Sequence, residues 1–232
     1  MESEDEGPTI LPGRIASTED EAMRSYQTLA LDFAKQNNTI VFLPTGSGKT
    51  RIGVELIRHY LDTTARQKVA FLAPRKLLLG QQFDTIKKRM PNGTGVKMFT
   101  GETIIRTPKG NLIIDVWNAD IWADEIMDCD VLCLTPQIFD HALHHGHLHS
   151  QHFSLVIFDE CHHCTGKGPM NQVMKKLFAQ EFTGRVLGLT ASPVKQKGKG
   201  SHSTAADVAT LEKNMNSRVL YPAAELGRYL RP

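Results

Sequence analysis

The chain has 232 residues, of which 41% are hydrophobic and 22% charged, the composition of a globular protein with a substantial core. Its formal net charge of +2 is too small to predict a general affinity for nucleic acid, so any basic binding surface must be local. No apolar run approaches the roughly 18 residues of a membrane-spanning helix, and the acidic first residues do not resemble a secretory signal. We therefore expect a cytoplasmic or nuclear protein with no membrane partner.

Composition and patterning divide the chain into four segments. Residues 1–20 are acidic and show no periodicity, which predicts a flexible N-terminus. Residues 21–194 alternate apolar strand-like runs with helical patterns, which predicts one α/β domain. Residues 195–204 form a basic, glycine-rich loop, and 205–232 are predicted to be a C-terminal helical extension.

The expected elements alternate in chain order. Strands are predicted at 40–43, 69–73, 96–100, 131–135, 155–158 and 186–190. One helix is predicted to follow the strand at 40–43 and to end at about 61, and another is predicted to begin at 136. Further helices are predicted at 75–90, 119–127, 169–179, 205–216 and 223–230. A turn within 103–117 predicts two short paired strands. This order predicts a mostly parallel, doubly wound sheet flanked by helices.

Between the first strand and its helix lies the segment Leu43-Pro44-Thr45-Gly46-Ser47-Gly48-Lys49-Thr50. Such a turn aims backbone N–H groups at an anion, and Gly46 and Gly48 permit its close approach. Lys49 can reach the outer phosphates of a nucleotide, and the Thr50 hydroxyl can ligate magnesium. The general pattern begins with glycine where this chain has Leu43, which disfavours small kinases and GTPases. The residues expected to bind the phosphates are Thr45, Gly46, Ser47, Gly48, Lys49 and Thr50.

The strand predicted at 155–158 ends in two adjacent carboxylates. Asp159 can hold Mg²⁺, normally through water, and Glu160 can orient and deprotonate the water that attacks the γ-phosphate. Standing alone, an Asp-Glu pair can equally cap a following segment. Together with the phosphate loop it predicts an ATPase site that uses ATP and Mg²⁺, with Lys49, Asp159 and Glu160 as catalytic residues.

Cysteines and histidines raise the alternative of a zinc site. Cys129 and Cys133 form one close pair, and Cys161 and Cys164 form a second beside His162. However, Cys133 lies inside an apolar run and Cys161 inside the carboxylate motif. We therefore expect reduced, non-ligating thiols and no structural zinc.

Four motifs occur in a fixed order, namely Arg24-Ser25-Tyr26-Gln27, the phosphate loop, the Asp159-Glu160-Cys161-His162 box and Leu189-Thr190-Ala191-Ser192. This order resembles the first RecA-like domain of superfamily 2 helicases, which implies a RecA-like P-loop NTPase fold. The resemblance implies that Gln27 reads the edge of adenine and that Arg24 stacks on its ring. It also implies that Thr190 and Ser192 bond the acidic box and link the ATP state to the grip on nucleic acid. His162 would be a fourth catalytic residue that couples this segment to the γ-phosphate.

Within that superfamily, the box extended by His163, the run Gly188 to Val194 and the segment Leu211 to Asn214 resemble the Dicer branch, related to the cytosolic viral-RNA sensors. The resemblance covers about residues 22–231. It implies RNA processing in RNA interference and a grip on the backbone of double-stranded RNA, which suits recognition of A-form shape. The matching positions, in three groups that follow predicted strands, are Pro74, Arg75, Lys76, Gln81, Thr100, Gly101, Glu102, Thr135, Pro136 and Gln137.

A superfamily 2 motor closes ATP between two RecA-like domains, the second of which supplies an arginine. We find one set of motifs, so we expect the first lobe of a double-stranded-RNA-stimulated ATPase or helicase, with poor turnover until a second RecA-like domain joins it. Two alternatives remain open. One is a nucleotide-gated protein or RNA interaction module without turnover. The other is a DNA-directed superfamily 2 translocase, because contacts to the backbone do not identify the sugar.

Overall fold

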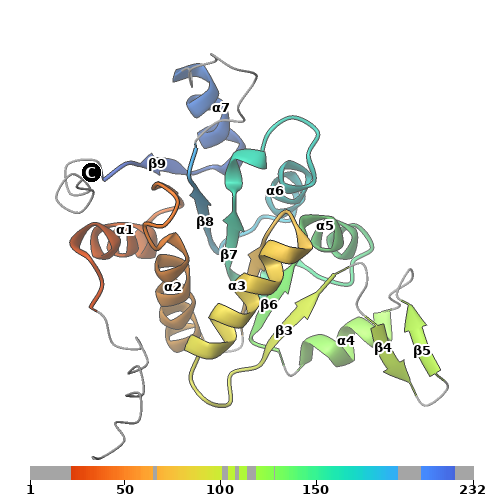
Figure 1. Cartoon of the computed structure of the whole chain (residues 1–232). Helices are drawn as coiled ribbons and strands as arrows, with labels where there is room; N and C mark the ends of the chain where they lie inside the picture. The colour runs from red at the N-terminus through yellow and green to blue at the C-terminus, as the bar shows by residue number, and fades with distance from the viewer. Residues whose placement is uncertain are drawn as a thin grey trace, which may run out of the picture.

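The computed structural model describes residues 22–64, 67–100, 104–107, 110–113, 119–127, 129–192 and 205–222. At its centre is a seven-stranded sheet in the order β3-β6-β2-β7-β8-β1-β9, in which neighbouring strands are parallel (Figure 1). The strands are β1 Thr39–Phe42, β2 Lys68–Leu72, β3 Val96–Phe99, β6 Val131–Leu134, β7 Phe153–Asp159, β8 Arg185–Thr190 and β9 Arg218–Leu220. The predicted parallel α/β sheet is therefore confirmed.

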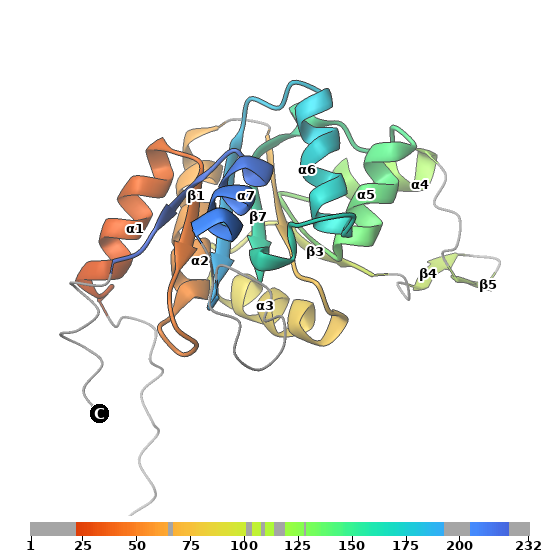
Figure 2. The same cartoon turned by 90° about the horizontal axis from the view of Figure 1, so that it is seen from above.

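Helices cover both faces of this sheet, as a doubly wound fold requires. Side chains of α1, α2 and α3 form one core with the sheet, and those of α4, α5, α6 and α7 form the other. Figure 2 shows α3 on one side of the sheet and α5 and α6 on the opposite side. The helices are α1 Ser25–Gln36, α2 Lys49–Thr63, α3 Lys76–Arg89, α4 Ala119–Met127, α5 Pro136–His144, α6 Pro169–Ala179 and α7 Ala205–Met215, with the short 3-10 helices η1 Ser150–His152 and η2 Cys161–His163.

Strand β7 shows why the central strands are continuous apolar runs in the sequence. Every residue of β7 is buried. Leu155 and Ile157 belong to the core that contains α2, whereas Val156 and Phe158 belong to the core that contains α6. Because helices cover both faces of the strand, its central residues are apolar on both faces, and polar residues lie only near its ends.

A small hairpin stands apart from the main sheet. Its strands, β4 Ile104–Thr107 and β5 Gly110–Ile113, pair antiparallel and form a separate two-stranded sheet. Figure 1 shows the hairpin beside α4. The two short paired strands predicted within 103–117 are therefore present.

The structure adds strand β9 where the sequence predicts only helix. The Arg218 N–H donates to the Asn38 carbonyl at 3.1 Å, and the Val219 N–H donates to Glu212 Oε1 at 2.8 Å. A strand of three residues is too short to carry an alternating pattern, so pairing with β1 is what creates it. The sheet thus includes residues beyond the predicted domain boundary at 194.

Several predicted segments lie outside the described residues, namely the N-terminus at 1–20, the basic loop at 195–204 and the helix at 223–230. Their proposed boundaries remain predictions. Within the part of the chain that the structure describes, no helix is both long enough and apolar enough to cross a bilayer.

Candidate active site

The carboxyl ends of the parallel strands meet along one edge of the sheet, the upper edge in Figure 1, where open α/β sheets bind ligands. The phosphate loop follows β1, Asp159 is the last residue of β7, and Thr190 is the last residue of β8. These strands are neighbours in the order β7-β8-β1. The sheet therefore brings together three motifs that are far apart in the sequence.

The phosphate loop owes its glycines to backbone conformation and to close packing. Gly46 and Gly48 have φ values of 80° and 78°, in the left-handed region that favours glycine. A Cβ on Gly48, the residue that precedes α2, would lie 2.4 Å from Gln27 Nε2. Thr45 is exposed and Thr50 half-buried at the first turn of α2. The loop is thus shaped both by the turn itself and by α1.

Lys49 folds back onto the loop. Its Nζ donates to the carbonyls of Leu43 at 3.0 Å and Pro44 at 3.1 Å. Burial lowers the pKa of Lys49, whereas the charges of Glu160 and Asp159 raise it. The ammonium group therefore lies in a partly desolvated position where both carboxylates act on it.

Helix α1 holds the loop through Tyr26 and Gln27. The Ser47 carbonyl accepts one hydrogen bond from the Tyr26 hydroxyl at 2.8 Å and a second from Gln27 Nε2 at 3.0 Å. The other end of the amide, Gln27 Oε1, accepts from the Arg24 N–H at 2.9 Å. Both ends of the Gln27 amide are thus engaged by the protein. Tyr26 is a loop-holding residue that sequence reasoning did not single out, because only the folded chain brings it to Ser47.

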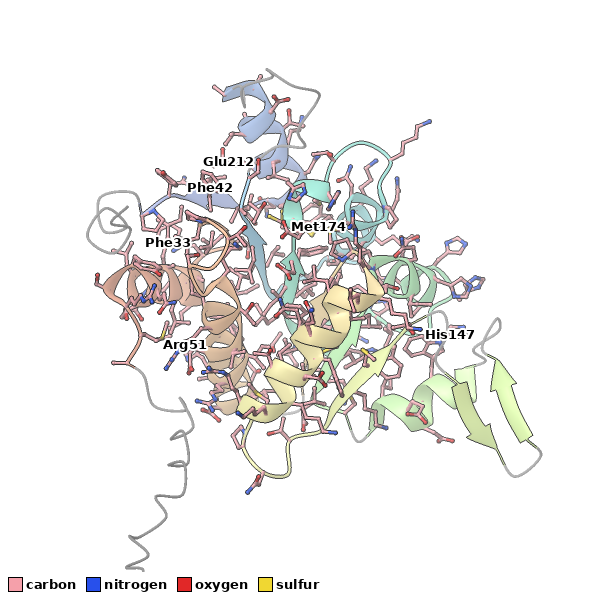
Figure 3. The ribbon with its side chains drawn as sticks, in the orientation of Figure 1. Phe33, Phe42, Arg51, His147, Met174 and Glu212 are labelled. Atoms are coloured by element: carbon pink, nitrogen blue, oxygen red, sulfur yellow. The ribbon has the colours of Figure 1, made fainter. Side chains whose placement is uncertain are left out.

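A cavity of about 250 Å³ opens between the loop, α1 and α3. Arg24 and Gln27, the two predicted adenine contacts, line it together with Arg51 and Arg89, which the sequence does not single out. Arg51 belongs to the first turn of α2 and is labelled below α1 in Figure 3. Arg51 Nε is buried and has no hydrogen-bond partner among the described residues. The cavity is therefore a cationic recess next to the phosphate loop.

Asp159 is a buried carboxylate, with 6% of its surface exposed. Burial and the neighbouring charge of Glu160 raise its pKa to about 6, although the Glu160 N–H, Lys49 and Gln82 partly oppose that increase. The Glu160 N–H donates to Asp159 Oδ1 at 3.0 Å, and Glu160 itself has φ = 52°. The strand thus ends in a strained turn that sets the two carboxylates side by side.

Gln82 on α3 contacts the same carboxylate and is a second residue that sequence reasoning missed. Its Nε2 donates to Asp159 Oδ2 at 3.2 Å. The adjacent Gln81, which the resemblance assigns to nucleic-acid contact, is exposed on α3. No sequence pattern distinguishes the two glutamines, because the contact joins residues of two separate elements.

His162 connects the acidic box to the end of β8. Its Nδ1 lies 3.2 Å from Glu160 Oε2 and 3.0 Å from Thr190 Oγ1. The Thr190 hydroxyl donates its single proton to the Ser192 carbonyl and accepts from the Ser192 N–H at 3.1 Å. His162 Nδ1 must therefore carry the proton, which Thr190 Oγ1 and Glu160 Oε2 share as acceptors in a three-centre contact. Ser192 joins this network through its backbone carbonyl and N–H.

The four cysteines at 129, 133, 161 and 164 are buried and not disulfide-bonded. Burial raises the pKa of Cys129 to about 11 and that of Cys164 to about 12, so neither favours the thiolate that binds zinc. Cys161 instead fills space under β8, where a Cβ on Gly188 would lie 2.8 Å from its Sγ. Among the described residues, no group of three or more His, Cys, Asp or Glu side chains could hold a metal ion.

The residues predicted to contact nucleic acid lie at the other half of the edge. They follow β2, β6 and β3, which are neighbours in the sheet. Arg75, Lys76, Gln81 and Gln137 are exposed, Pro74 and Thr135 are half-buried, and Thr100 and Pro136 are buried. Gly101 and Glu102 lie outside the described residues. The sheet order thus places three separate groups side by side.

Comparisons with known proteins identify the family to which the chain belongs. Residues 16–195 match the model of the family described as type III restriction enzyme, res subunit. The chain is 36% identical over 205 residues to endoribonuclease Dicer homolog 2 of Arabidopsis thaliana, covering 84% of the chain. It is 33% identical over 214 residues to Dicer-like protein 2 of Phaeosphaeria nodorum, covering 90% of the chain. It spans 14% of the length of each relative.

The fold is also found in a solved structure. The crystal structure of the Pyrococcus furiosus Hef helicase domain matches 90% of this chain and 40% of its own with a TM-score of 0.72 and 24% identity. A RecA-like α/β fold follows from this match and from the parallel sheet. The chain therefore belongs to the family of type III restriction enzyme res subunits and is a Dicer-like, superfamily 2 helicase domain.

Proposed function

We propose that the chain is the ATP-binding first motor lobe of a Dicer-like, double-stranded-RNA-stimulated ATPase or helicase used in RNA processing. The observation that carries the proposal is the convergence of Lys49, Asp159 and Glu160 at the ends of β1 and β7, where the charges of both carboxylates act on the lysine. A lysine beside two carboxylates at a helix N-terminus is what phosphoryl transfer requires.

The triphosphate binds at the N-terminus of α2, where the loop presents its N–H groups. Lys49 exchanges its hydrogen bonds to the Leu43 and Pro44 carbonyls for charge-assisted bonds to phosphate oxygens, which are stronger. The cavity beside the loop receives adenine, with Arg24 on its ring and Gln27 at its edge. Gln27 Oε1 accepts from the Arg24 N–H and keeps a second lone pair for the adenine amino group.

Thr50 and Asp159 hold the magnesium ion that accompanies ATP. Asp159 fits this role because burial and Glu160 raise the pKa of its carboxyl group, and a divalent cation relieves both effects. When bound, the ion neutralises charge on the β- and γ-phosphates. The hydroxyl of Thr50 and the carboxylate of Asp159 are oxygen ligands of the kind that magnesium prefers.

Glu160 takes the proton of the attacking water, and His162 orients Glu160 through the contact of 3.2 Å. His162 also contacts Thr190, whose hydroxyl is bonded to the backbone of Ser192. A change at the γ-phosphate can therefore pass from Glu160 through His162 to the segment that follows β8.

Exposed cations at the start of α3 grip the nucleic acid. Arg75 and Lys76 precede and begin this helix, and Gln137 lies exposed at the start of α5. Contacts of this kind go to phosphates and carry no base sequence, which suits a reader of A-form shape. Titration with duplex RNA beside duplex DNA distinguishes the two nucleic acids.

A second RecA-like domain completes the site. The chain spans 14% of the length of its Dicer-like relatives, which leaves room for such a domain in the full protein. The arginine that this domain supplies is worth about 10³ to 10⁵ in rate. The isolated chain therefore binds Mg-ATP weakly and turns it over slowly.

The test is nucleotide titration of Lys49→Ala. We expect most of the ATP affinity to be lost while the circular dichroism spectrum stays unchanged, because the ammonium group contacts the phosphates and lies outside the core. Lys175→Ala, at an exposed lysine on α6, is the matched control. A folded Lys49→Ala protein with wild-type affinity would refute the phosphate-loop assignment.

A further inference from the structure

Gln82 hydrogen-bonds to Asp159, the candidate magnesium ligand, and its own carbonyl oxygen is buried without a partner among the described residues. We propose that Gln82 is a positioning residue that holds Asp159 for magnesium and accepts a hydrogen bond from a water molecule bound to the ion. The inference rests on the proposed function, because it assigns a new role at that same site.

The orientation of the Gln82 amide follows from its partner. Nε2 lies 3.2 Å from Asp159 Oδ2. An ionised carboxylate can only accept hydrogen bonds, so the NH₂ end of the amide must face it. The carbonyl end, Oε1, therefore does not bond to Asp159.

That carbonyl end is the unexplained atom. Gln82 Oε1 is buried and has no hydrogen-bond partner among the described residues. Buried amide oxygens are nearly always satisfied by protein or water, so each exception requires an explanation. Gln82 shares this feature with Arg51, which lines the cavity beside the phosphate loop and whose Nε is also buried without a partner in the described part of the chain.

A magnesium-bound water supplies the missing donor. Magnesium dehydrates reluctantly and keeps several waters, which act as hydrogen-bond donors around the ion. The oxygens of Asp159 each accept one bond, Oδ1 from the Glu160 N–H and Oδ2 from Gln82, which fixes the carboxylate while leaving lone pairs free. Partners that orient a ligand in this way tune metal affinity by about 10- to 100-fold.

A purely structural role for Gln82 makes a different prediction. If the amide only attached α3 to β7, its loss would weaken nucleotide binding equally with and without magnesium. The proposal instead requires that the loss appear only when magnesium is present. The ratio of the two affinities therefore separates the two roles.

The experiment measures the affinity of the full chain for a fluorescent ADP analogue in magnesium buffer and in EDTA. Gln82→Met keeps the length of the side chain but removes both hydrogen-bonding groups. We expect it to weaken binding about tenfold in magnesium and to leave binding in EDTA unchanged. Gln172→Met, at a half-buried glutamine on α6, is the matched control. An unchanged ratio of affinities, or an equal loss in both buffers, would overturn the inference.

A double-mutant cycle gives a second readout. In an Asp159→Asn background, Gln82→Met should cost much less affinity than in the wild type, because the carboxylate that it positions is absent. Additive losses would overturn the inference. If Gln82→Met does not fold, Gln82→Asn takes its place, since its shorter amide cannot reach Asp159. If magnesium does not increase the nucleotide affinity of the wild-type chain, the proposed function and this inference are both wrong. If magnesium increases the affinity of the wild type and of Gln82→Met equally, only this inference is wrong.

Discussion

The two halves of the carboxyl edge of the sheet are organised differently. At the ends of β7, β8 and β1, side chains are buried or half-buried and hydrogen-bonded, as Asp159 is to Gln82 of α3 and Thr190 to His162. At the ends of β2, β6 and β3, the polar side chains of Arg75, Lys76 and Gln137 are exposed. Both halves are formed by the same parallel sheet.

The difference fits what each half is proposed to bind. A reaction at a single phosphorus atom requires groups held in fixed positions, which burial and hydrogen bonds provide. A grip on a long polyanion requires exposed charges that can follow a backbone. Substitutions in the first half should therefore change chemistry and stability, whereas those in the second should change neither stability nor the affinity for nucleotide.

The largest expected effect is the loss of ATP turnover in Glu160→Gln, measured in a chain extended through the second RecA-like domain. The amide fills the same volume but cannot take the proton of the attacking water. We expect ATP binding to be retained and turnover to fall by about 10² to 10⁴.

Steady-state ATP hydrolysis with duplex RNA measures this loss, and Glu55→Gln, at a half-buried glutamate on α2, is the control. Retained turnover in Glu160→Gln would show that the buried half does not hold the proton acceptor. Brisk RNA-stimulated turnover by the 232-residue chain alone would show that it completes its own site.

A second prediction concerns stability and pH. The pKa of Asp159 is raised from 3.8 to about 6, so the folded chain binds this proton more tightly than the unfolded chain. The corresponding stability is present below about pH 4 and is lost as the pH rises through about 6. In the absence of ligand, Asp159→Asn should therefore stabilise the chain by roughly 2 to 3 kcal/mol near pH 7 and by little near pH 4.

Urea unfolding at the two pH values checks this prediction. Arg75→Ala, from the exposed half of the edge, should change the free energy of unfolding by less than about 0.5 kcal/mol at both. The proposed difference between the halves is wrong if Asp159→Asn raises the free energy of unfolding equally at both pH values. It is also wrong if Arg75→Ala raises that free energy as much as Asp159→Asn does.

The smallest effect is expected where α1 holds the phosphate loop. Tyr26→Phe removes one of two donors to the Ser47 carbonyl and should weaken ATP and GTP alike, by about fivefold. Gln27→Ala removes the other donor and the proposed adenine contact, so ATP should lose more than GTP. Nucleotide titration of both variants decides the matter. Equal losses of ATP and GTP in Gln27→Ala would leave Gln27 only its role in holding the loop.

Much of the fold and part of the site follow from sequence alone. The central strands are predictable because helices cover both their faces, which makes each strand a continuous apolar run. The phosphate loop and the acidic box are predictable because each is a contiguous segment that directly follows such a strand. The short β9 is not predictable in this way, since three residues carry no pattern.

How these pieces meet depends on the packing of the folded domain. The strand order put Asp159 beside the loop and divided the carboxyl edge into two halves. It also placed Gln82, and not Gln81, against Asp159, and brought Tyr26 to the Ser47 carbonyl. These contacts join side chains of separate elements, and their geometry depends on how helices pack against the sheet. Local sequence determines which segments become strands, loops and helices, whereas the choice of partners depends on packing across the whole domain.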